Sequence, residues 1–353
     1  MSSPATSSAA NPVAVVTGAS AGVGRATARA LAHEGFDVAV IARGSVGLKA
    51  VATEIERLGR KAMTVAVDVA DASGVERAIA EIEAGLGPID VLVNNAMTTV
   101  FSPVERITPA EFERATRVTY LGQVHATMAV LPRMKARDHG VIVSVGSALA
   151  FRGIALQAPY CGAKFAVRGF HESVRTELRH QRSRVRIVQV HLPAVNTPQF
   201  SWCRNKMQRQ PMPVAPIYAP EVAARAIVAA ATRPRRQRIV GTWNWGLVQL
   251  SKLAPGIIDH FAARTTVDGQ QTEEPANAGS PDNLDHPLDG DDGTDRGATG
   301  EFVERSDGVL DPSFIRTLPE TVANVVRSLV DRIREVGSDW TARVDTRGST
   351  RVR

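Results

Sequence analysis

The sequence is poor in cysteine and has no long apolar run. Its 353 residues include two cysteines, which exclude a disulfide framework and suit a reducing compartment. No apolar run reaches the roughly 18 residues that would cross a bilayer. Residues 1–11 are rich in Ser and Ala and lack the basic start and apolar core of a signal peptide. We therefore expect a cytoplasmic protein with a disordered leader over residues 1–11.

Patterns typical of metal and nucleic-acid binding are also missing. Histidines such as His33, His125 and His171 stand alone on predicted helices, so we predict no metal site. The net charge is +6, but residues 1–267 hold +14 (32 basic and 18 acidic side chains). A basic body suits either a nucleic acid or an anionic cofactor. Because aromatic and basic residues do not interleave and no zinc spacing occurs, we predict no nucleic-acid partner.

Short apolar, β-branched runs alternate with amphipathic stretches over residues 12–241. Such runs are typical of parallel strands buried on both faces, and the stretches between them are typical of crossover helices. The pattern predicts one domain with a Rossmann-type doubly wound parallel sheet and helices on both faces. Within it, Thr108–Glu111 has the capping box of a helix start. The predicted strands are Val13–Val16, Val38–Ile41, Ala62–Val67, Val91–Val93, Val141–Val145, Val185–Val190 and Ile239–Val240.

The sequence changes character after this domain and forms a C-terminal extension. Residues 242–267 are an apolar segment with two tryptophans, which we interpret as a lid or a subunit interface; contact with a membrane surface is the alternative. Residues 268–300 carry nine acidic side chains and one arginine and are rich in Gly, Asp and Pro, which predicts a disordered linker. The tail, residues 301–353, has a capping box and an apolar stripe that predict one amphipathic helix over about 318–336.

A glycine loop follows the first predicted strand directly and leads into a helix. Glycine lets the backbone turn sharply and approach a pyrophosphate, whose charge the N–H groups at the start of the helix bind. The strand–loop–helix order is the arrangement that this mechanism requires. We therefore predict a bound dinucleotide, with contacts from Gly18, Ser20, Ala21, Gly22, Val23 and Gly24.

Arg43 ends the second predicted strand, about 20 residues beyond the glycines. An acidic side chain at this place would bind the ribose 2′-hydroxyl of NAD, whereas an arginine accommodates a 2′-phosphate. No Asp or Glu stands at position 42 or 43. The sequence therefore favours NADP(H) as the cofactor, and NAD(H) is the alternative.

Three polar residues, Ser147, Tyr160 and Lys164, are predicted to meet at the carboxyl edge of the sheet. Ser147 closes the fifth strand, and Lys164 lies one helical turn after Tyr160 on the same face. A phenol with a pKa of about 10 is a poor base, but a neighbouring ammonium favours the phenolate and lowers that pKa. Tyr160 would then move a proton to or from a carbonyl oxygen that Ser147 positions by a hydrogen bond. The set predicts an oxidoreductase in which all three residues are catalytic.

The order of these motifs resembles the short-chain dehydrogenase/reductase family over about two-thirds of the chain. Thr17–Gly24 is similar to the cofactor loop of that family, Asn94–Ala96 to its strand-four motif, and Tyr160–Lys164 to its YxxxK motif. The resemblance implies that Tyr160 and Lys164 also contact the cofactor, Lys164 through the nicotinamide ribose. It implies further cofactor contacts by Asp68, Val69, Asn95, Ala96, Pro193, Val195 and Thr197.

Met97 and Ala194 stand where the family usually has Gly, and a third departure bears on catalysis. The family has an Asn in its fourth helix, three residues before a Gly, and Thr119 takes that place here. The Asn is associated with a water that leads to the lysine, partly through its backbone carbonyl, and any residue retains a carbonyl. We therefore predict that Thr119 is part of an altered catalytic relay, and loss of turnover is the alternative.

The function that follows is NADP(H)-dependent interconversion of a carbonyl and an alcohol in a small-molecule substrate. The predicted lid, about residues 195–220, contains Met207, Met212, Arg204 and Arg209, which suggest an apolar pocket with a cationic rim. Two alternatives stay open. One is a nucleotide-binding scaffold of the same fold without turnover, and the other is a peripheral membrane reductase of lipid-like substrates. The family resemblance also implies a homo-oligomer.

Overall fold

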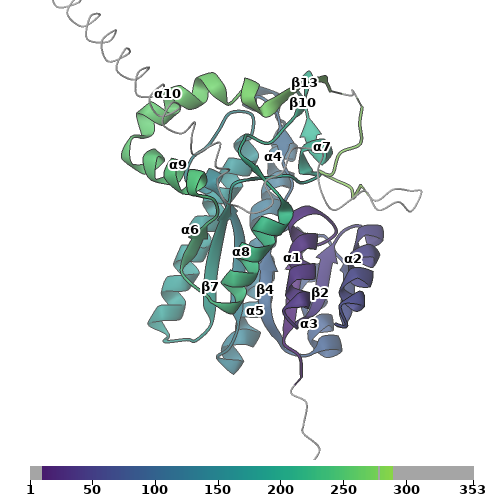
Figure 1. The fold of residues 1–353 in the computed structure, drawn as a ribbon. Helices are drawn as coiled ribbons and strands as arrows, with labels where there is room; N and C mark the ends of the chain where they lie inside the picture. The colour runs from purple at the N-terminus through teal and green to yellow at the C-terminus, as the bar shows by residue number, and fades with distance from the viewer. Residues whose placement is uncertain (1–9, 277–278, 289–353) are drawn as a thin grey trace, which may run out of the picture. The chain divides into compact units, whose positions relative to one another are not determined.

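The computed structural model describes residues 10–276 and 279–288 of the protein. Seven parallel strands form its central sheet, in the order β12-β7-β6-β4-β1-β2-β3 (Figure 1). The chain starts in the middle of the sheet and builds outward to each edge, so the strand order reverses beside β1. This confirms the predicted doubly wound sheet. The strands are β1 (Val13–Thr17), β2 (Asp37–Ala42), β3 (Ala62–Ala66), β4 (Ile89–Asn94), β6 (Val141–Ser147), β7 (Arg186–Leu192) and β12 (Gln237–Ile239).

Successive side chains of a strand pack on opposite faces of the sheet, and here both faces are covered by helices. In β1, Ala14 and Val16 contact one helical layer, whereas Val13 and Val15 contact the other. All four are buried, which explains why the run is apolar without alternation. One layer holds α1 (Gly22–His33), α2 (Ser45–Arg57) and α8 (Pro220–Thr232), and the other holds α3 (Ala72–Leu86), α5 (Gly122–Arg137) and α6 (Ala158–His180) (Figure 1).

The predicted capping box begins α4 (Pro109–Thr116), which confirms that helix start. The N–H of Glu111 donates to the Thr108 hydroxyl over 3.3 Å, and the N–H of Thr108 donates to the Glu111 carboxylate over 2.8 Å. A π-helical turn, Arg117–Leu121, then joins α4 to α5. Such turns widen a helix and are frequent at functional sites. This one contains Thr119.

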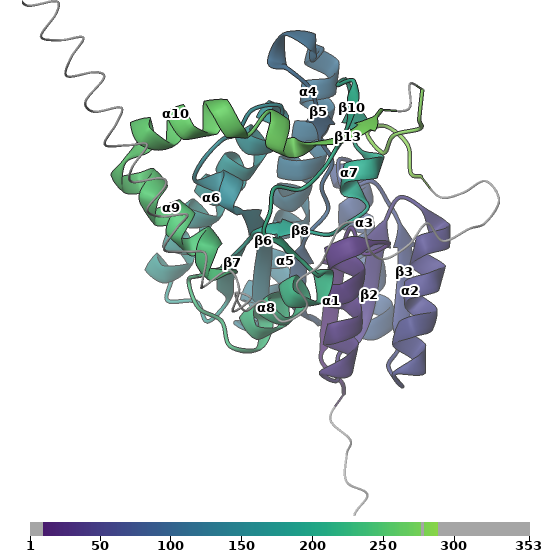
Figure 2. The same ribbon diagram turned by 45° about the horizontal axis from the view of Figure 1, so that its top comes forward.

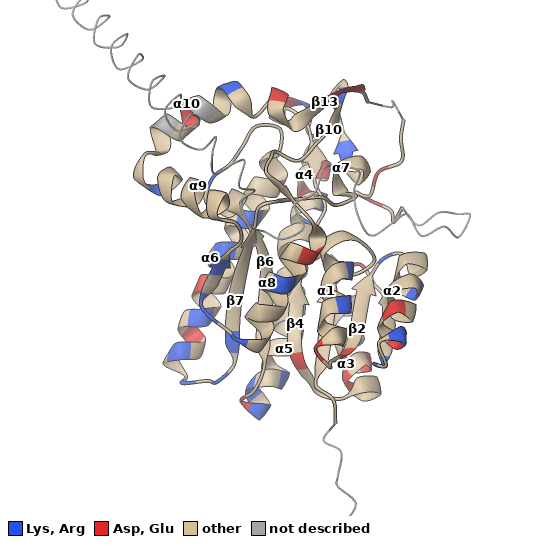
Figure 3. Cartoon of the chain, viewed as in Figure 1, with Lys and Arg blue, Asp and Glu red and all other residues tan. Residues whose placement is uncertain are grey.

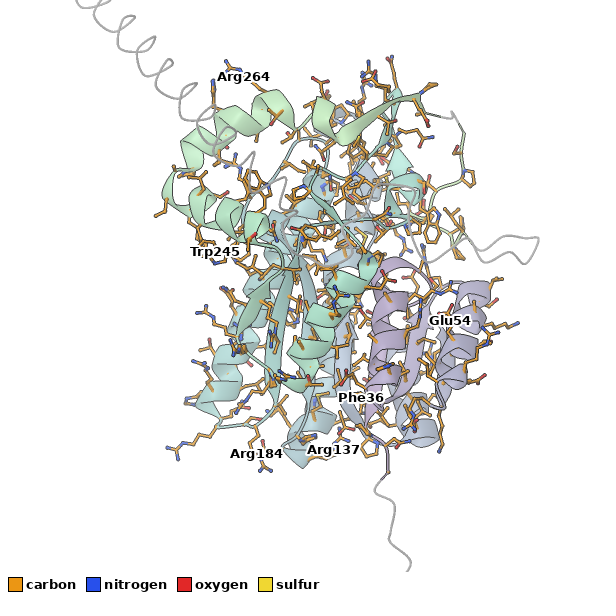
Figure 4. All side chains as sticks on the ribbon, in the orientation of Figure 1. Phe36, Glu54, Arg137, Arg184, Trp245 and Arg264 are labelled. Atoms are coloured by element: carbon orange, nitrogen blue, oxygen red, sulfur yellow. The ribbon has the colours of Figure 1, made fainter. Side chains whose placement is uncertain are left out.

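Short elements and two further helices cover the carboxyl ends of the strands (Figure 2). The predicted lid forms α7 and several two- or three-residue strands, and residues 242–267 form α9 and α10. We call the described residues from 242 onward the cap. On its outer side, Trp245 of α9 and Arg264 of α10 are exposed (Figure 4). The remaining elements are β5 (Val100–Phe101), η1 (Val104–Arg106), η3 (Ala148–Ala150), β8 (Ala194–Val195), α7 (Gln199–Trp202), β9 (Arg204–Asn205), β10 (Arg209–Pro211), β11 (Ile217–Tyr218), α9 (Thr242–Leu253), α10 (Pro255–Thr265), η4 (Asp268–Gln270) and β13 (Gln271–Pro275).

The prediction of a disordered linker over residues 268–300 is wrong for the described part of that segment. Its first residues form η4 and β13, and β13 pairs antiparallel with β10 of the lid. Further on, Leu284 is fully buried. The acidic composition misled because these acids have basic partners: the Arg204 guanidinium forms ion pairs with both Asp282 and Asp285, at 2.9 and 2.8 Å.

Some predicted segments lie outside the described residues. They are residues 1–9 of the leader, the end of the linker and the whole tail with its helix over about 318–336. Asn11 belongs to the ordered part, because its amide donates to Asp37 at the start of β2. Of the helices that the structure describes, none has the length and apolar character needed to cross a membrane. Within the same residues, no group of three or more His, Cys, Asp or Glu side chains could hold a metal ion.

Candidate active site

The glycine loop turns at the carboxyl edge of the sheet, between β1 and α1. Gly18 has a φ of +65°, and a Cβ there would lie 2.7 Å from the Cα of Ala96. A Cβ on Gly24 would lie 2.0 Å from the carbonyl oxygen of Gly18, so this position admits no side chain. No side chain caps α1, whose first N–H groups therefore remain available to an anion. The loop has the shape and the free donors that a pyrophosphate requires.

Asn95 holds this loop in shape from the end of β4. Its amide donates to the carbonyl oxygens of Thr17 and Gly18, each over 3.1 Å. In return, the Thr17 hydroxyl accepts the backbone N–H groups of Asn95 at 3.0 Å and of Ala96 at 3.2 Å. The side chain of Asn95 is thus occupied within the protein. Its amide acts on a cofactor through the loop that it fixes.

Arg43 and Asp68 lie at the far end of the same site, after β2 and β3. The guanidinium of Arg43 donates to the carbonyl oxygens of Asn283 at 2.5 Å and Leu284 at 3.2 Å. The Asp68 carboxylate accepts a hydrogen bond from Arg114 of α4 at 2.5 Å. Both residues predicted to bind the adenosine end are therefore held by partners that the sequence analysis did not identify.

Ser147, Tyr160 and Lys164 come together from the end of β6 and the start of α6. Ser147 forms a hydrogen bond with Tyr160, and its hydroxyl oxygen also accepts the N–H of Leu149 at 3.1 Å. The Lys164 ammonium lies 5.5 Å from the centre of the Tyr160 ring and donates to the carbonyl oxygen of Val145 at 2.7 Å. The predicted catalytic set is one spatial cluster.

The pKa values of this cluster differ in direction from the prediction for Tyr160. Burial raises the pKa of Tyr160 to about 12, and the hydrogen bond with Ser147 only partly opposes this shift. Burial also lowers the pKa of Lys164 to about 8. The predicted lowering of the tyrosine pKa by lysine is therefore wrong here, because burial disfavours the charged form of each residue. At neutral pH the structure favours a protonated phenol beside a charged ammonium.

Thr119 does not face the cavity. Its hydroxyl donates to the carbonyl oxygen of Thr98 at 2.7 Å and accepts the N–H of the same residue at 3.0 Å. The side chain is fully buried and is committed to holding the loop after β4. Any part that Thr119 plays in a proton relay must come from its backbone within the π-helical turn.

A cavity of about 590 Å³ connects the glycine loop with Ser147, Tyr160 and Lys164. Of the predicted cofactor residues, all but Gly24 line it. The predicted cationic rim is wrong, because neither arginine of the lid lines the cavity: Arg204 pairs with acids of the cap, and Arg209 lies 3.7 Å from Glu273. Figure 3 shows basic and acidic positions near one another around β10 and β13. The part beyond the catalytic cluster is mainly apolar and includes Phe101, Leu149, Trp202, Val214, Leu247 and Ile258.

The sequence indicated a lid or an interface over residues 242–267, but nothing in it singled out residues 283–288 as part of the cavity wall. Leu247 and Ile258 of the cap, together with Asn283, line it. The one available signal was Leu284, an apolar residue between Asn283 and Asp285 in a segment that is mainly polar. Composition averaged over the segment conceals such a residue.

Comparisons with known proteins agree with this geometry. The family model described as short chain dehydrogenase matches residues 12–208. An uncharacterized oxidoreductase, YxnA of Bacillus subtilis, is 32% identical over 267 residues, which cover 75% of each chain. The 3-ketodihydrosphingosine reductase of Bos taurus is 29% identical over 67% of this chain and 73% of its own. A solved metagenomic short-chain oxidoreductase in complex with NADP is 28% identical, with a TM-score of 0.55 over 66% of this chain and 98% of its own.

The fold and the site together define an oxidoreductase with a dinucleotide-type cavity. The chain belongs to the short-chain dehydrogenase family.

Proposed function

We propose that the protein uses NADP(H) to interconvert a carbonyl and an alcohol, with Tyr160, Lys164 and Ser147 as its catalytic residues. The observation that carries this proposal is the single cavity that has the glycine loop at one end and these three side chains at the other. The metagenomic neighbour solved with NADP also supports the choice of cofactor.

The residues present fit a phosphorylated dinucleotide. A side chain at Gly18 or Gly24 would collide with neighbouring backbone atoms, so only glycine permits the shape of this loop. The uncapped start of α1 supplies N–H donors for the pyrophosphate. Arg43 supplies a cation for a 2′-phosphate, and no acid stands at position 42 or 43 to bind a bare 2′-hydroxyl. When bound, the nicotinamide supplies or accepts the hydride.

The side chains of the cluster perform the proton transfer. At neutral pH Tyr160 carries its proton, because its pKa is about 12, and it donates that proton to the carbonyl oxygen. The Lys164 ammonium stabilises the phenolate that remains. Ser147 donates a hydrogen bond to the same oxygen and thereby fixes its distance from Tyr160. The protonated tyrosine is the form that the reduction of a carbonyl requires.

The walls of the cavity indicate an apolar substrate. Trp202 of the lid and Ile258 of the cap enclose the region beyond Tyr160. An apolar wall binds an extended hydrocarbon better than a polar metabolite. The name of the bovine relative, a ketodihydrosphingosine reductase, also supports a lipid-like ketone. We therefore propose a carbonyl group carried on an apolar chain.

The test is NADPH oxidation with a panel of ketones and aldehydes of increasing chain length. The Tyr160→Phe variant should lose about 10²- to 10⁴-fold in kcat, the usual contribution of a general acid. Tyr120→Phe removes the same hydroxyl on the π-helical turn, away from the cavity lining, and should keep its activity. NADPH binding without turnover of any compound would instead support the nucleotide-binding scaffold.

A further inference from the structure

Residues 282–288 of the cap, which we call the strap, return from β13 past α7 to the cofactor cavity (Figures 1 and 2). They are fixed at several points. The N–H of Asn283 donates to the carbonyl oxygen of Trp202 at 2.8 Å, and its side-chain amide donates to Gln199 at 3.1 Å. Leu284 is fully buried in a small cluster with Val100 and Ala115. The strap therefore has a defined place on the lid and on α4.

The backbone of the strap binds the two arginines at the adenosine end of the cavity. Arg43 donates to the carbonyl oxygens of Asn283 and Leu284, from its two terminal nitrogens. Arg114 donates to the carbonyl oxygen of Leu284 at 3.0 Å and also to Asp68 at 2.5 Å. The contacts of Arg43 join residues 240 and 241 positions apart in the sequence, and the contact of Arg114 with Leu284 spans 170 positions. They fix the plane of the Arg43 guanidinium.

The strap lines the cavity beside Arg43 and uses only part of the hydrogen-bonding capacity of its guanidinium. Asn283, Pro287 and Leu288 line the same cavity as Arg43 and Asp68. A guanidinium has five N–H donors, and the two carbonyl hydrogen bonds use two of them. The remaining donors can still bind an anion, now in a fixed orientation. A pre-oriented guanidinium loses less entropy when it binds a phosphate than a mobile one does.

We propose that the strap determines cofactor specificity: the carbonyl groups of Asn283 and Leu284 orient Arg43 for the 2′-phosphate of NADP(H). The inference rests on the proposed cofactor and adds a positioning element that lies outside the matched family region, residues 12–208. Arg43 contacts the phosphate, and the strap acts through Arg43.

Two mononucleotides that differ by one phosphate test the proposal without any turnover. Calorimetry would give the Kd of adenosine 2′,5′-bisphosphate and of adenosine 5′-monophosphate for the full chain. The unmodified protein should bind the bisphosphate more tightly. Leu284→Asn places an uncharged polar group in the apolar cluster and should release the strap. We expect it to reduce the ratio of the two affinities about tenfold, the equivalent of one charge-assisted hydrogen bond.

His286→Asn is the matched control, because His286 is an exposed residue of the same strap. It should leave the ratio within about twofold, as exposed substitutions usually do. Leu284→Ala is a milder second variant, and thermal unfolding of each variant shows that the sheet domain is intact. In an Arg43→Leu background, Leu284→Asn should no longer change the ratio, because the strap then has no guanidinium to orient.

Three results would overturn the proposal. An unchanged ratio in both Leu284 variants means that the strap does not orient Arg43. If the Leu284 variants bind both nucleotides more weakly by the same factor, the strap only covers the adenosine. Tighter binding of the bisphosphate by the Leu284 variants than by the unmodified protein means that the carbonyl groups of the strap compete with the phosphate for Arg43. A protein that shows this nucleotide preference but reduces no carbonyl compound would refute the proposed reaction and leave the strap in place.

Discussion

The cofactor cavity is enclosed by two regions that are built in different ways. Its floor is the carboxyl edge of the sheet, where the glycine loop, Ser147 and Tyr160 lie at the ends of long buried elements. Its roof is the lid, which is built of short elements, and the cap, and ion pairs of Arg204 with Asp282 and Asp285 connect the two. Buried strands fix positions tightly, because close packing resists displacement.

The difference suggests a division of roles. The floor carries the groups that we propose perform the reaction, which must be held within a fraction of an ångström. The roof carries the apolar wall and the strap over Arg43, to which we assign the choice of substrate and of cofactor. Substitutions in the floor should therefore affect stability and catalysis, whereas those in the roof should affect selectivity. Three measurements would break or sharpen this contrast.

The largest effect is expected at the tightest point of the floor, Gly24. Gly24→Ala places a Cβ 2.0 Å from the carbonyl oxygen of Gly18, so the loop or α1 must shift. We expect the free energy of unfolding to fall by about 3 kcal/mol, as measured by urea denaturation. Gly169→Ala on α6 is the control, because its Cβ meets nothing within 4 Å. It should stabilise the helix by about 0.5–1 kcal/mol. Equal unfolding midpoints for the two variants would contradict the prediction.

The second effect concerns the charge of Lys164 in the floor. Its pKa of about 8 means that the ammonium is present at pH 7 and is lost as the pH rises above about 8. Because Tyr160 keeps its proton up to about pH 12, the loss of activity should follow lysine alone. We expect kcat/KM for reduction to fall about tenfold for each pH unit above 8. Lys164→Arg keeps the charge and should abolish this alkaline limb. A flat profile for the unmodified enzyme up to pH 10 would argue against the role of the ammonium.

The smallest effect is expected in the roof, at Ile258 of α10. Its side chain is 6% exposed and lines the apolar part of the cavity. Ile258→Ala should raise KM for a long ketone such as 2-decanone about fivefold, which corresponds to one or two buried methylene groups. KM for NADPH and for acetone should stay unchanged. Leu253→Ala, at a position 85% exposed on α9, is the control for a change in the cap outside the cavity. A parallel rise of KM for acetone would show that Ile258 supports the site as a whole.

Much of the floor could be predicted from the sequence because its signals are local. Val13–Val16 is apolar without alternation, since both faces of its sheet are buried. The glycine loop and the spacing of Tyr160 and Lys164 each lie within a few residues, so one helix or one turn sets their geometry. The capping box at Thr108 was visible for the same reason. Within such a short span, the backbone can adopt few other conformations.

Electrostatics and long-range packing could not be predicted in this way. The pKa of Tyr160 depends on how much water surrounds it, and this is set by segments from the whole chain. The spacing to Lys164 predicted an attraction but contained no measure of desolvation. Thr119 likewise stands where the family has an Asn, but its hydroxyl binds Thr98, a loop residue 21 positions earlier.

The sequence by itself determined the doubly wound sheet, the glycine loop and the clustering of Ser147, Tyr160 and Lys164, since periodicity and short spacing specify them. Only the tertiary structure decided the partners of Arg43 and the path of the strap. A backbone carbonyl acceptor has no sequence signature, because every residue carries one. Whether an acidic side chain is solvated or forms an ion pair depends on which segments pack against it in the folded protein. Asn283 and Leu284 therefore became recognisable as part of the site only in the folded chain.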